Sequence, residues 1–570
     1  MVRVDQFRFS RTGKGMPTGA QILIDQLVAE GVAHVFTVPG ESFLAALDAM
    51  HGSPEISPIT CRNEAGAAMM AEATGKLLGA PGVALVTRGP GAANAVPGVY
   101  IAHQDATPML LLVGLPPRRM HGLPAFQNID ITALFGSIAK WCAVVPSADE
   151  LAHHLQEAFS VANSGRPGPV VLGLPEDVLL ENGEATAPAR PMLSALAPAP
   201  GKIEHLRLLL ASAETPLVIA GSSVWGRDAA RGLASFADTF DIPVATSFRR
   251  QDHIDNRHRC YVGHAGLGLD PQLATGIRAS DLLIVFGDAL GDITTQGFTL
   301  VQPPNPKQKI VHIAQNAGEE NGLYVSNLAI RASPELTALA LAKMPGFEIA
   351  QTWATWRRDL RSAYEATKSP KTTPGKVRLE EIIAMLSETL PPSAILCNGA
   401  GNYAAFLHRY FTYKSYPTQL APIAGSMGYG LPAAIAAKLM HPERTVIALA
   451  GDGCFQMTQQ ELQTAVQFGL PIVIIIANNG TLGTIRMHQE YHYPGRVIAT
   501  SLINPDFAAL AHSCGAHGER VKATAEFPAA LERALSSGKT AVIELKLDPE
   551  AISPNQTITN LRAVSKMQSI

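Results

Sequence analysis

The stretch that decides the fold reads TVIALAGDGCFQMTQQELQTAVQFGLPIVIIIANNGTLG and spans residues 445–483. Two apolar runs within it, TVIALA and PIVIIIA, have the length and composition of buried strands, and the segment MTQQELQTAVQF between them has apolar residues at helical spacing. Together they predict a βαβ unit. Its two strands would be parallel, so we expect Asp452 and Asn479, which follow them, at the same edge of a sheet.

Oxygen-bearing side chains at that edge indicate a site for a divalent cation and a diphosphate. Asp and Asn oxygens are hard ligands, and Mg²⁺ usually joins one or two such groups to phosphate oxygens. Gly451, Gly453 and Gly480 suit positions where the backbone turns tightly or approaches a phosphate. Taken alone, GDG is an ordinary turn and NN an ordinary loop. At the ends of two neighbouring strands, they favour a diphosphate clamp.

Length and composition are typical of a large enzyme with several domains. The chain has 570 residues, of which 47% are hydrophobic and 16% charged, which is enough for about three domains. No apolar run reaches the roughly 18 residues of a membrane span, and a formal charge of −3 gives no electrostatic reason to expect nucleic acid or a membrane as a partner. The six cysteines form no CxxC pair and the N-terminus has no apolar signal segment, so we expect a cytoplasmic protein.

Two Pro-containing stretches, 185–201 and 366–376, are typical of linkers and divide the chain into three parts. Strand-like runs that end in glycine alternate with helical segments, such as GVALVTRG and EAGAAMMAEATGKLL in the first part and PLVIAG in the second. We therefore predict an α/β fold of three successive doubly wound parallel-sheet domains. Their expected bounds are 16–184, 202–345 and 376–550.

The GDG motif, followed after 24 residues by NN, resembles the signature of enzymes that depend on thiamine diphosphate (ThDP). The sequence resembles their acetolactate synthase branch over most of the chain. The resemblance implies a pyrimidine-binding domain, a central domain and a diphosphate-binding domain, in that order. It places the Mg²⁺ ligands at Asp452, Asn479 and Thr481, the last through its carbonyl oxygen. Further coenzyme contacts are expected from the same two loops, at Gly451, Gly453, Cys454 and Gly483.

Glu64 is the candidate for the acid that activates the aminopyrimidine ring of the coenzyme. It begins an Ala- and Met-rich segment whose small residues permit close packing, and burial there would raise the pKa of its carboxyl. A structural explanation also exists, because a glutamate in the first turn complements the helix dipole. The stretch RNEAGAAMMAEA resembles the segment that carries the activating glutamate of the family. We interpret Glu72, two turns later, as a solvated or capping residue.

A bulky apolar residue is expected beneath the V-shaped coenzyme, where it would hold the two rings against each other. Met427 lies among small residues in GSMGYGLPAA, and its flexible thioether suits an irregular gap against aromatic rings. Plain core packing is the alternative for this methionine. The resemblance places the wedge residue of the family at Met427 and a coenzyme contact at Gly425.

Short matches in the first domain indicate residues of a substrate pocket. TRGPGAAN resembles the TSGPGATN turn of the family, with Arg88 in place of the usual serine. AFQ resembles the acetolactate synthase stretch whose Phe and Gln face the reacting centre, which here are Phe126 and Gln127. His488 stands where those synthases carry a tryptophan, and Glu176 where they usually carry a lysine.

Glu41, in VPGES, is a departure that bears on the reaction itself. Acetolactate synthases usually have a small residue there, whereas the 2-oxo acid decarboxylases of the family have a catalytic aspartate. A carboxylate beside the reacting carbon would relay a proton after CO₂ leaves. The start of a helix just after Gly40 explains Glu41 equally well.

The central part resembles a nucleotide-binding domain that has lost its signature. FAD-binding relatives carry an ARFDDR-like turn after the strand that here reads DLLIVFGD, whereas residues 288–292 of this chain are DALGD. After KIVHIA comes Gln315 instead of an acidic residue suited to a ribose hydroxyl. We therefore expect no tightly bound FAD.

The resemblance implies a ThDP- and Mg²⁺-dependent carboligase that decarboxylates a small 2-oxo acid and transfers the acyl-anion equivalent to an acceptor. The alternative is a non-oxidative 2-oxo acid decarboxylase, or another ThDP lyase, with Glu41 as proton relay; an FAD-linked oxidase ranks third. The arrangement of the family implies active sites between the subunits of a homodimer or homotetramer. The expected catalytic residues are Glu64, Glu41 and Gln127, and the expected substrate-pocket residues are Phe126, Arg88 and His488.

Overall fold

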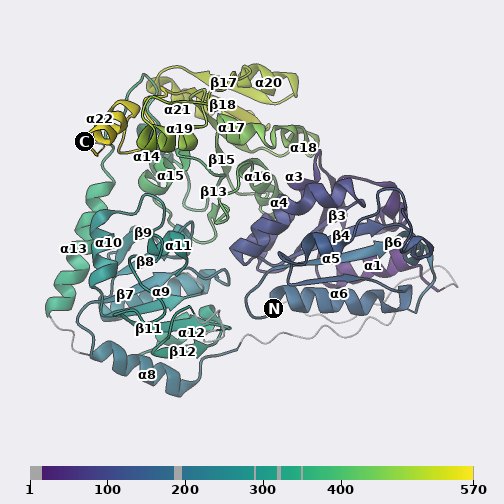
Figure 1. The fold of residues 1–570 in the computed structure, drawn as a ribbon, viewed down its shortest axis with the longest axis horizontal. Coiled ribbons are helices and arrows are strands. Elements are labelled where there is room, and N and C mark those ends of the chain that lie inside the picture. Colours follow the sequence, from purple (N-terminus) through teal and green to yellow (C-terminus); the bar gives the residue numbers. More distant parts are fainter. Residues whose placement is uncertain (1–15, 185–195, 288–289, 317–322, 348–350, 569–570) are drawn as a thin grey trace.

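The computed structural model describes residues 16–184, 196–287, 290–316, 323–347 and 351–568. It contains three sheets of six strands each, and every strand pairing in them is parallel. Figure 1 shows the three units, with the first at the right, the second at the lower left and the third at the upper left. The predicted fold class is therefore confirmed. None of the described helices is long and apolar enough to cross a membrane.

The first sheet has the strand order β2-β1-β3-β4-β6-β5. Alternate residues of its strands face opposite helical layers: Phe36 and Leu111 lie in the core with α3 and α4, whereas Val35 and Leu110 lie in the core with α1 and α6. The strands are β1 (His34–Thr37), β2 (Ser57–Thr60), β3 (Gly82–Val86), β4 (Met109–Leu115), β5 (Trp141–Val144) and β6 (Pro169–Pro175). The helices are α1 (Gly19–Ala29), α2 (Leu44–His51), α3 (Glu64–Leu78), α4 (Pro90–Asp105), α5 (Ile131–Phe135), α6 (Ala148–Asn163) and α7 (Glu176–Leu180), with short 3₁₀ turns η1 (Glu41–Phe43) and η2 (Arg118–Met120).

The third sheet, with the order β14-β13-β15-β16-β18-β17, repeats the topology of the first strand for strand. Its strands are β13 (Ile395–Asn398), β14 (Gln419–Leu420), β15 (Val446–Gly451), β16 (Val473–Asn478), β17 (His517–Val521) and β18 (Ala541–Lys546). The helices are α14 (Leu379–Thr389), α15 (Tyr403–Tyr410), α16 (Gly430–Met440), α17 (Asp452–Gln456), α18 (Leu462–Gln467), α19 (Gly483–His492), α20 (Phe507–Ser513), α21 (Phe527–Ser536) and α22 (Ile558–Gln568), with 3₁₀ turns η4 (Gln459–Glu461) and η5 (Thr524–Glu526).

The central sheet has a different order, β12-β11-β10-β7-β8-β9, which is the order of dinucleotide-binding domains. The 17-residue helix α13 packs beside β9 and α10, where Trp356 donates its indole N–H to the Pro216 carbonyl. The strands are β7 (Pro216–Ala220), β8 (Val244–Ser247), β9 (Tyr261–Ala265), β10 (Leu282–Phe286), β11 (Lys309–Ala314) and β12 (Leu328–Arg331). The helices are α8 (Pro200–Ala211), α9 (Arg227–Phe240), α10 (Pro271–Ala279), α11 (Asp292–Thr295), α12 (Pro334–Leu341) and α13 (Gln351–Thr367), with the 3₁₀ turn η3 (Gln251–His253).

The first and third units share one hydrophobic core. Helix α3 of the first unit packs against α16 of the third unit and against α4 of its own unit, and Figure 1 shows where the two units meet. Small residues permit the close contact of α3 with α4, since a Cβ added at Gly98 of α4 would lie 2.4 Å from the Ala68 side chain of α3. The carboxyl ends of both sheets are thereby held in a fixed relation.

Candidate active site

Asp452 and the asparagine pair lie at one edge of the third sheet, as the sequence predicts. Strands β15 and β16 are parallel neighbours, with Gly451 opposite Ala477, so both motifs follow directly at their carboxyl ends. The Asp452 carboxylate is buried and accepts the backbone N–H of Gly453 and of Gly480, each at 2.8 Å. Burial raises the pKa of Asp452, and these hydrogen bonds act in the opposite direction.

Asn504 belongs to the same cluster, although the sequence analysis does not identify it. Its side-chain amide donates to Asp452 Oδ2 at 2.7 Å and to Asn478 Oδ1 at 2.9 Å. Gln456 of α17 donates in turn to Asn504 Oδ1 at 2.8 Å. Asn504 lies in a coil segment without a motif, and only the bridge between Thr481 and Ser501 brings it back to the sheet edge. No local signal marks it.

The two asparagines of the NN pair point in different directions. Asn478 is buried and donates its amide to Glu544 Oε1 at 2.6 Å, so its side chain belongs to the protein interior. Asn479 is only half-buried, and its Oδ1 accepts the Thr481 N–H at 3.1 Å. The Thr481 hydroxyl is bonded to the Thr500 carbonyl at 2.9 Å. Asn479 is thus the asparagine whose side chain lies in the turn after β16.

The oxygen donors at this edge fit a small hard cation. A carboxylate, a side-chain amide oxygen and a backbone carbonyl are available at Asp452, Asn479 and Thr481, and Mg²⁺ prefers oxygen ligands of this kind. The glycines keep the edge open: a Cβ at Gly453 would lie 2.6 Å from Leu482, and one at Gly483 3.3 Å from the Asn479 amide. Gly480 has a φ of +66°, which a residue with a side chain rarely adopts.

The loop with Met427 lies beside this edge, after β14 and before α16. Gly425 has a φ of +70°, and the space around its Cβ position is open. The Gly428 N–H donates to the sulfur of Cys454 at 3.2 Å, and the Tyr403 hydroxyl donates to the same sulfur at 3.1 Å. The buried Cys454 thus joins the GDG turn to the Met427 loop. Met427 is half-buried against the core of the third unit.

Glu64 is the first residue of α3 and is 8% exposed. Its Oε2 accepts the side-chain amide of Asn94 from α4 at 3.0 Å. A Cβ added at Gly91 would lie 3.2 Å from Glu64 Oε1, so glycine at this position makes room for the carboxyl. The position is a buried one, as the activating role requires, and Asn94 is an orienting residue that the sequence analysis does not single out.

The other first-domain candidates gather where β1 and β3 end. A Cβ at Gly40 would lie 2.5 Å from the Thr87 side chain, which places Glu41, exposed at the start of η1, beside the turn that carries Arg88. A Cβ at Gly89 would lie 2.7 Å from the carbonyl oxygen of Gln127. Adjacent strands with connections to opposite faces form a topological switch point, where ligands bind in such sheets.

Two predicted residues are not drawn into either cluster by contacts within the described chain. Phe126 is 75% exposed, and His488 is exposed on α19. Among the described residues, the hydrogen bond of the Glu64 side chain goes to Asn94, and none reaches Asp452 or Asn479. The structure of one chain therefore presents two half-sites, one on the first unit and one on the third.

The interpretation of Glu72 as solvated or capping is wrong. Its side chain is completely buried, and its carboxylate accepts the hydroxyls of Thr107 at 2.7 Å and Tyr429 at 2.5 Å and lies 3.0 Å from Lys76 Nζ. The cause is the packing of α3 against α16 of the third unit, which buries the face of α3 that carries Glu72. A helical pattern in the first domain gives no sign of that contact.

Comparison with known proteins decides the family. The N-terminal TPP binding domain of thiamine pyrophosphate enzymes matches residues 17–134, the central domain of these enzymes matches 203–341, and their C-terminal TPP binding domain matches 399–545. The mitochondrial acetolactate synthase catalytic subunit of Saccharomyces cerevisiae is 30% identical over 93% of this chain and 81% of its own length. The chain belongs to the thiamine pyrophosphate enzyme family.

Bacterial relatives agree with this assignment. The acetolactate synthase large subunit of Haemophilus influenzae is 29% identical over 95% of this chain and 96% of its own length. The acetolactate synthase isozyme 2 large subunit of Escherichia coli is 28% identical over 93% and 95% of the two chains. The predicted resemblance to acetolactate synthases and the predicted class, a ThDP-dependent enzyme with acyl-transfer chemistry, are thereby confirmed.

Two of the departures from the family pattern are partners in this thiamine pyrophosphate enzyme. Arg88 follows β3 and Glu176 begins α7, and their nearest charged atoms, Nη1 and Oε2, are 3.5 Å apart. The Arg88 side chain is 12% exposed, and its buried Nε has no hydrogen-bond partner among the described residues. A cation at the β3 end and an anion at the β6 end thus occur together, where the family usually has serine and lysine.

In the central domain, aromatic and imidazole rings occupy the carboxyl ends of β7 and β10. Trp225 stacks on His253 with the ring centres 5.0 Å apart, and its edge meets Phe286. The His253 Nε2 lies 2.8 Å from the Ser222 carbonyl oxygen. Of the DALGD turn, residues 288–289 lie outside the described part of the chain. The expectation about FAD stays a prediction.

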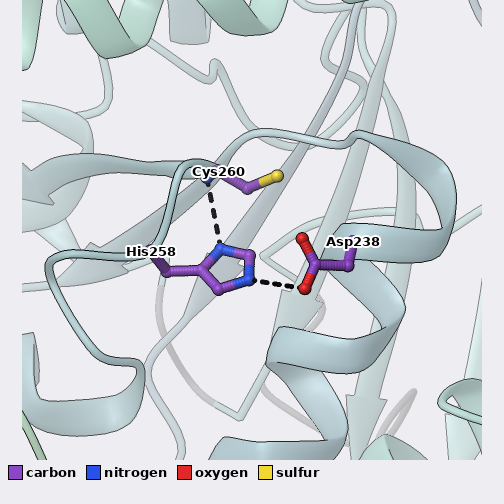
Figure 2. Close-up of side chains that lie close together, drawn as sticks. All are labelled: Asp238, His258 and Cys260. Atoms are coloured by element: carbon purple, nitrogen blue, oxygen red, sulfur yellow. Dashed lines mark hydrogen bonds and ion pairs between the residues drawn. The ribbon is translucent and has the colours of Figure 1, made fainter.

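A second group of potential metal ligands lies far from these loops in sequence. Asp238, His258 and Cys260 bring ligand atoms within 4.8 Å of one another, and Figure 2 shows the imidazole between the Cys260 backbone and the Asp238 carboxylate. Arg259 donates to Asp238 at 3.0 Å, and burial raises the pKa of the Cys260 thiol to about 12. Arg259 therefore pairs with the carboxylate of this cluster, and the cluster joins α9 to the segment before β9.

Proposed function

We propose that this protein is a ThDP- and Mg²⁺-dependent carboligase of small 2-oxo acids, similar in reaction to acetolactate synthase. It would decarboxylate one 2-oxo acid and transfer the acyl-anion equivalent to an acceptor. The observation that carries the proposal is the contact of Gly480 with Asp452 at 2.8 Å, which sets the asparagine turn against the carboxylate at the carboxyl edge of the third sheet. The names of the relatives, which are acetolactate synthases, support the reaction class.

The third unit would hold the metal and the diphosphate. Asp452, Asn479 and the Thr481 carbonyl would bind Mg²⁺, and Mg²⁺ would join them to phosphate oxygens. The backbone of the same loops would line the diphosphate, at Gly451, Gly453, Cys454 and Gly483. When bound, the coenzyme supplies the carbon nucleophile and the electron sink for decarboxylation, while the protein supplies position and electrostatics.

The remaining candidate residues would position and protonate the reactants. Glu64 would share a proton with a nitrogen of the pyrimidine ring, and its hydrogen bond from Asn94 orients the carboxyl. Met427 would hold the two rings in a bent arrangement. Gln127 and Phe126 would face the reacting centre. Arg88 and His488 would complete the substrate pocket.

A complete site would require two copies of the chain. Glu64 and Asp452 belong to different units and make no hydrogen bond to each other. Several large apolar side chains of the first and third units are exposed, and apolar side chains that gather on a surface mark interaction sites. They are Phe126, Met457, Ile485, Ile498 and Ile503. We infer a homodimer or homotetramer in which the first unit of one copy faces the third unit of the other.

A second candidate function, simple decarboxylation, rests on Glu41. Its carboxylate is exposed beside the turn between β3 and α4, where a proton relay to the carbanion equivalent would have to lie. If protonation of the carbanion equivalent were faster than its transfer to an acceptor, the product would be a free aldehyde. Glu41 also stands at the start of η1, where a structural role would explain it equally well. The reaction products therefore distinguish a proton relay from a structural residue.

The test is the identity of the products formed from pyruvate by the purified protein with ThDP and Mg²⁺. We expect CO₂ and a 2-hydroxy-2-alkyl-3-oxo acid, with that product retained in Glu41→Gln. Release of free aldehyde, abolished in Glu41→Gln, would support the decarboxylase. Failure to release CO₂ from any small 2-oxo acid would overturn both. The absorbance of the purified protein between 350 and 500 nm, roughly the range of flavins, checks the expectation that FAD is not tightly bound.

A further inference from the structure

The loop that carries Met427 is held in place by a charged side chain of the first unit. Asp105, the last residue of α4, is 1% exposed. Its Oδ2 accepts the N–H of Ile423 and its Oδ1 accepts the N–H of Ala424, both at 2.9 Å. One buried carboxylate thus fixes two consecutive amides immediately before Gly425.

Lys76 of α3 pairs with this carboxylate, and Glu72 of α3 pairs with Lys76. Lys76 Nζ lies 2.6 Å from Asp105 Oδ2 and also donates to the Ala421 carbonyl at 3.2 Å. Glu72 lies 3.0 Å from the same ammonium group and accepts the Tyr429 hydroxyl at 2.5 Å. The charged side chains of Lys76 and Glu72 therefore contact the loop on both sides of Met427, at Ala421 and at Tyr429.

The central unit contributes a third contact to the same loop. Arg249 is 4% exposed and donates to the carbonyl of Pro422 and, at 3.0 Å, to the carbonyl of Gly399, which follows β13. Arg249 thus contacts backbone atoms of the loop. The side chain of Met427 packs instead against the core of its own unit.

Stability alone does not explain these charges. Burying ionised groups carries a large desolvation penalty, and apolar residues of similar volume often stabilise a protein as well or better. The surrounding contact between α3 and α16 is apolar. Directed hydrogen bonds to backbone amides do what apolar packing does not, since they fix the position of a loop.

We propose that Asp105 is a positioning residue for the coenzyme. Through the amides of Ile423 and Ala424 it sets the turn at Gly425 and hence the place of Met427, while Lys76 and Glu72 hold its carboxylate in position. The proposal rests on the proposed function, because it assigns a coenzyme contact to Met427. It adds that the geometry of this contact is set by a residue outside the third unit.

The test compares Asp105→Asn with Asp281→Asn. Asp281 is a matched control, because its carboxylate also accepts two consecutive amides, those of Glu214 at 2.7 Å and Thr215 at 3.0 Å, at the opposite, amino-terminal end of the central sheet. Amide hydrogen exchange of the peptide 421–430 is measured without coenzyme. ThDP affinity in the presence of Mg²⁺ is measured by calorimetry, and kcat at saturating ThDP by CO₂ release.

In Asp105→Asn we expect faster amide exchange in residues 421–430 and weaker ThDP binding. We also expect kcat to fall about 10–100-fold, because a misplaced reacting group reduces the rate by such factors. Excess ThDP should not restore this kcat. Asp281→Asn should match the wild type in all three. Should Asp105→Asn not fold, Lys76→Gln must show the same three changes in smaller degree.

Two contrary results are distinguishable. Equal exchange, affinity and kcat in Asp105→Asn and Asp281→Asn, with a wild type that binds ThDP, would overturn the positioning role alone. A wild type that takes up no ThDP in the presence of Mg²⁺ would overturn the proposed function and this proposal with it.

Discussion

Asn504 joins the two motif loops at the level of single residues. Its amide holds Asp452 and Asn478 together, so Asn504→Ala should loosen the oxygen donors without removing any of them. Loss of a residue that orients metal ligands typically lowers metal affinity about 10–100-fold, and we expect that range for Mg²⁺. Titration of ThDP binding with Mg²⁺ measures it. Asn327→Ala, which removes a similar side-chain bond to the Ile310 amide in the central unit, is the control and should leave the affinity unchanged.

Glu64→Gln tests the acid assigned to the pyrimidine ring. The amide keeps the shape and the contact with Asn94 but cannot accept or release the proton, so kcat should fall about 10²–10⁴-fold. ThDP should still bind, which calorimetry checks. Glu30, at the end of α1, is 8% exposed like Glu64, and Glu30→Gln should retain kcat. A Glu64→Gln enzyme with wild-type kcat would refute the assignment.

For single residues, the sequence predicts the position of a side chain where that position depends on spacing along the chain. Asp452 and Asn479 are found because each directly follows a recognisable strand. Asn504 and Asn94 are not found, since tertiary packing alone brings them to their partners. The pairing of Arg88 with Glu176 is likewise invisible, although each residue is conspicuous by itself. Glu72 is misjudged for the same reason, because its partners Tyr429 and Thr107 lie on other elements.

Among the helices, α22 is attached to α19 both by apolar contacts and by a buried acid. Glu490 of α19 accepts Arg562 of α22 at 2.7 Å and Arg486 at 2.8 Å, and its side chain is fully buried. These contacts, led by the hydrogen bond from Arg562, lower the pKa of Glu490 to about 2. Folding therefore gains stability from this group above its ordinary pKa of roughly 4.3, and the gain is lost as the pH falls from that value toward about 2.

Glu490→Gln should reduce the free energy of unfolding by about 1–3 kcal/mol at neutral pH, the range for a hydrogen bond to a charged group. The difference from the wild type should shrink as the pH falls below roughly 4. Urea denaturation at several pH values measures both. Glu204→Gln breaks the exposed pair with Arg207, which solvent screens, and should change stability much less than Glu490→Gln does. Equal effects of the two substitutions would contradict the role of burial.

Strands are predicted more accurately than the helix between the motifs. The apolar runs TVIALA and PIVIIIA become β15 and β16, and EAGAAMMAEATGKLL becomes α3 without change. The segment 457–468 is divided into η4 and α18, and at their junction the Glu461 carboxylate accepts the backbone N–H groups of Arg62 and Asn63 of the first unit. Helical periodicity alone carries no information about such a contact.

For the whole molecule, alternation of strands and helices is enough to predict three parallel sheets, but not their topology. The first and third sheets share one strand order, and the central sheet has another. The strand order of a parallel sheet depends on which face of the sheet each connecting helix covers. A helix that covers either face has the same apolar pattern in its sequence, so the pattern does not reveal the strand order. The common core of α3, α4 and α16 is hidden for the same reason.

We predict that the protein assembles into a dimer or tetramer. If a second copy covers the half-sites, the protein should sediment as a dimer or tetramer at micromolar concentration. Ile503, which is fully exposed in one chain, would then be buried, and Ile503→Glu should promote dissociation and lower activity in parallel. Leu208→Glu, on the outer face of α8, is the control and should do neither. A fully active monomer would contradict shared sites.

Calorimetric titration of ThDP into the protein measures whether Asp452 and the turn after β16 bind the coenzyme diphosphate through Mg²⁺. We predict heat of binding with Mg²⁺ present, loss of that signal on chelation of the metal, and no binding by Asp452→Ala. Binding of equal affinity with and without Mg²⁺, or by Asp452→Ala as by the wild type, would contradict it.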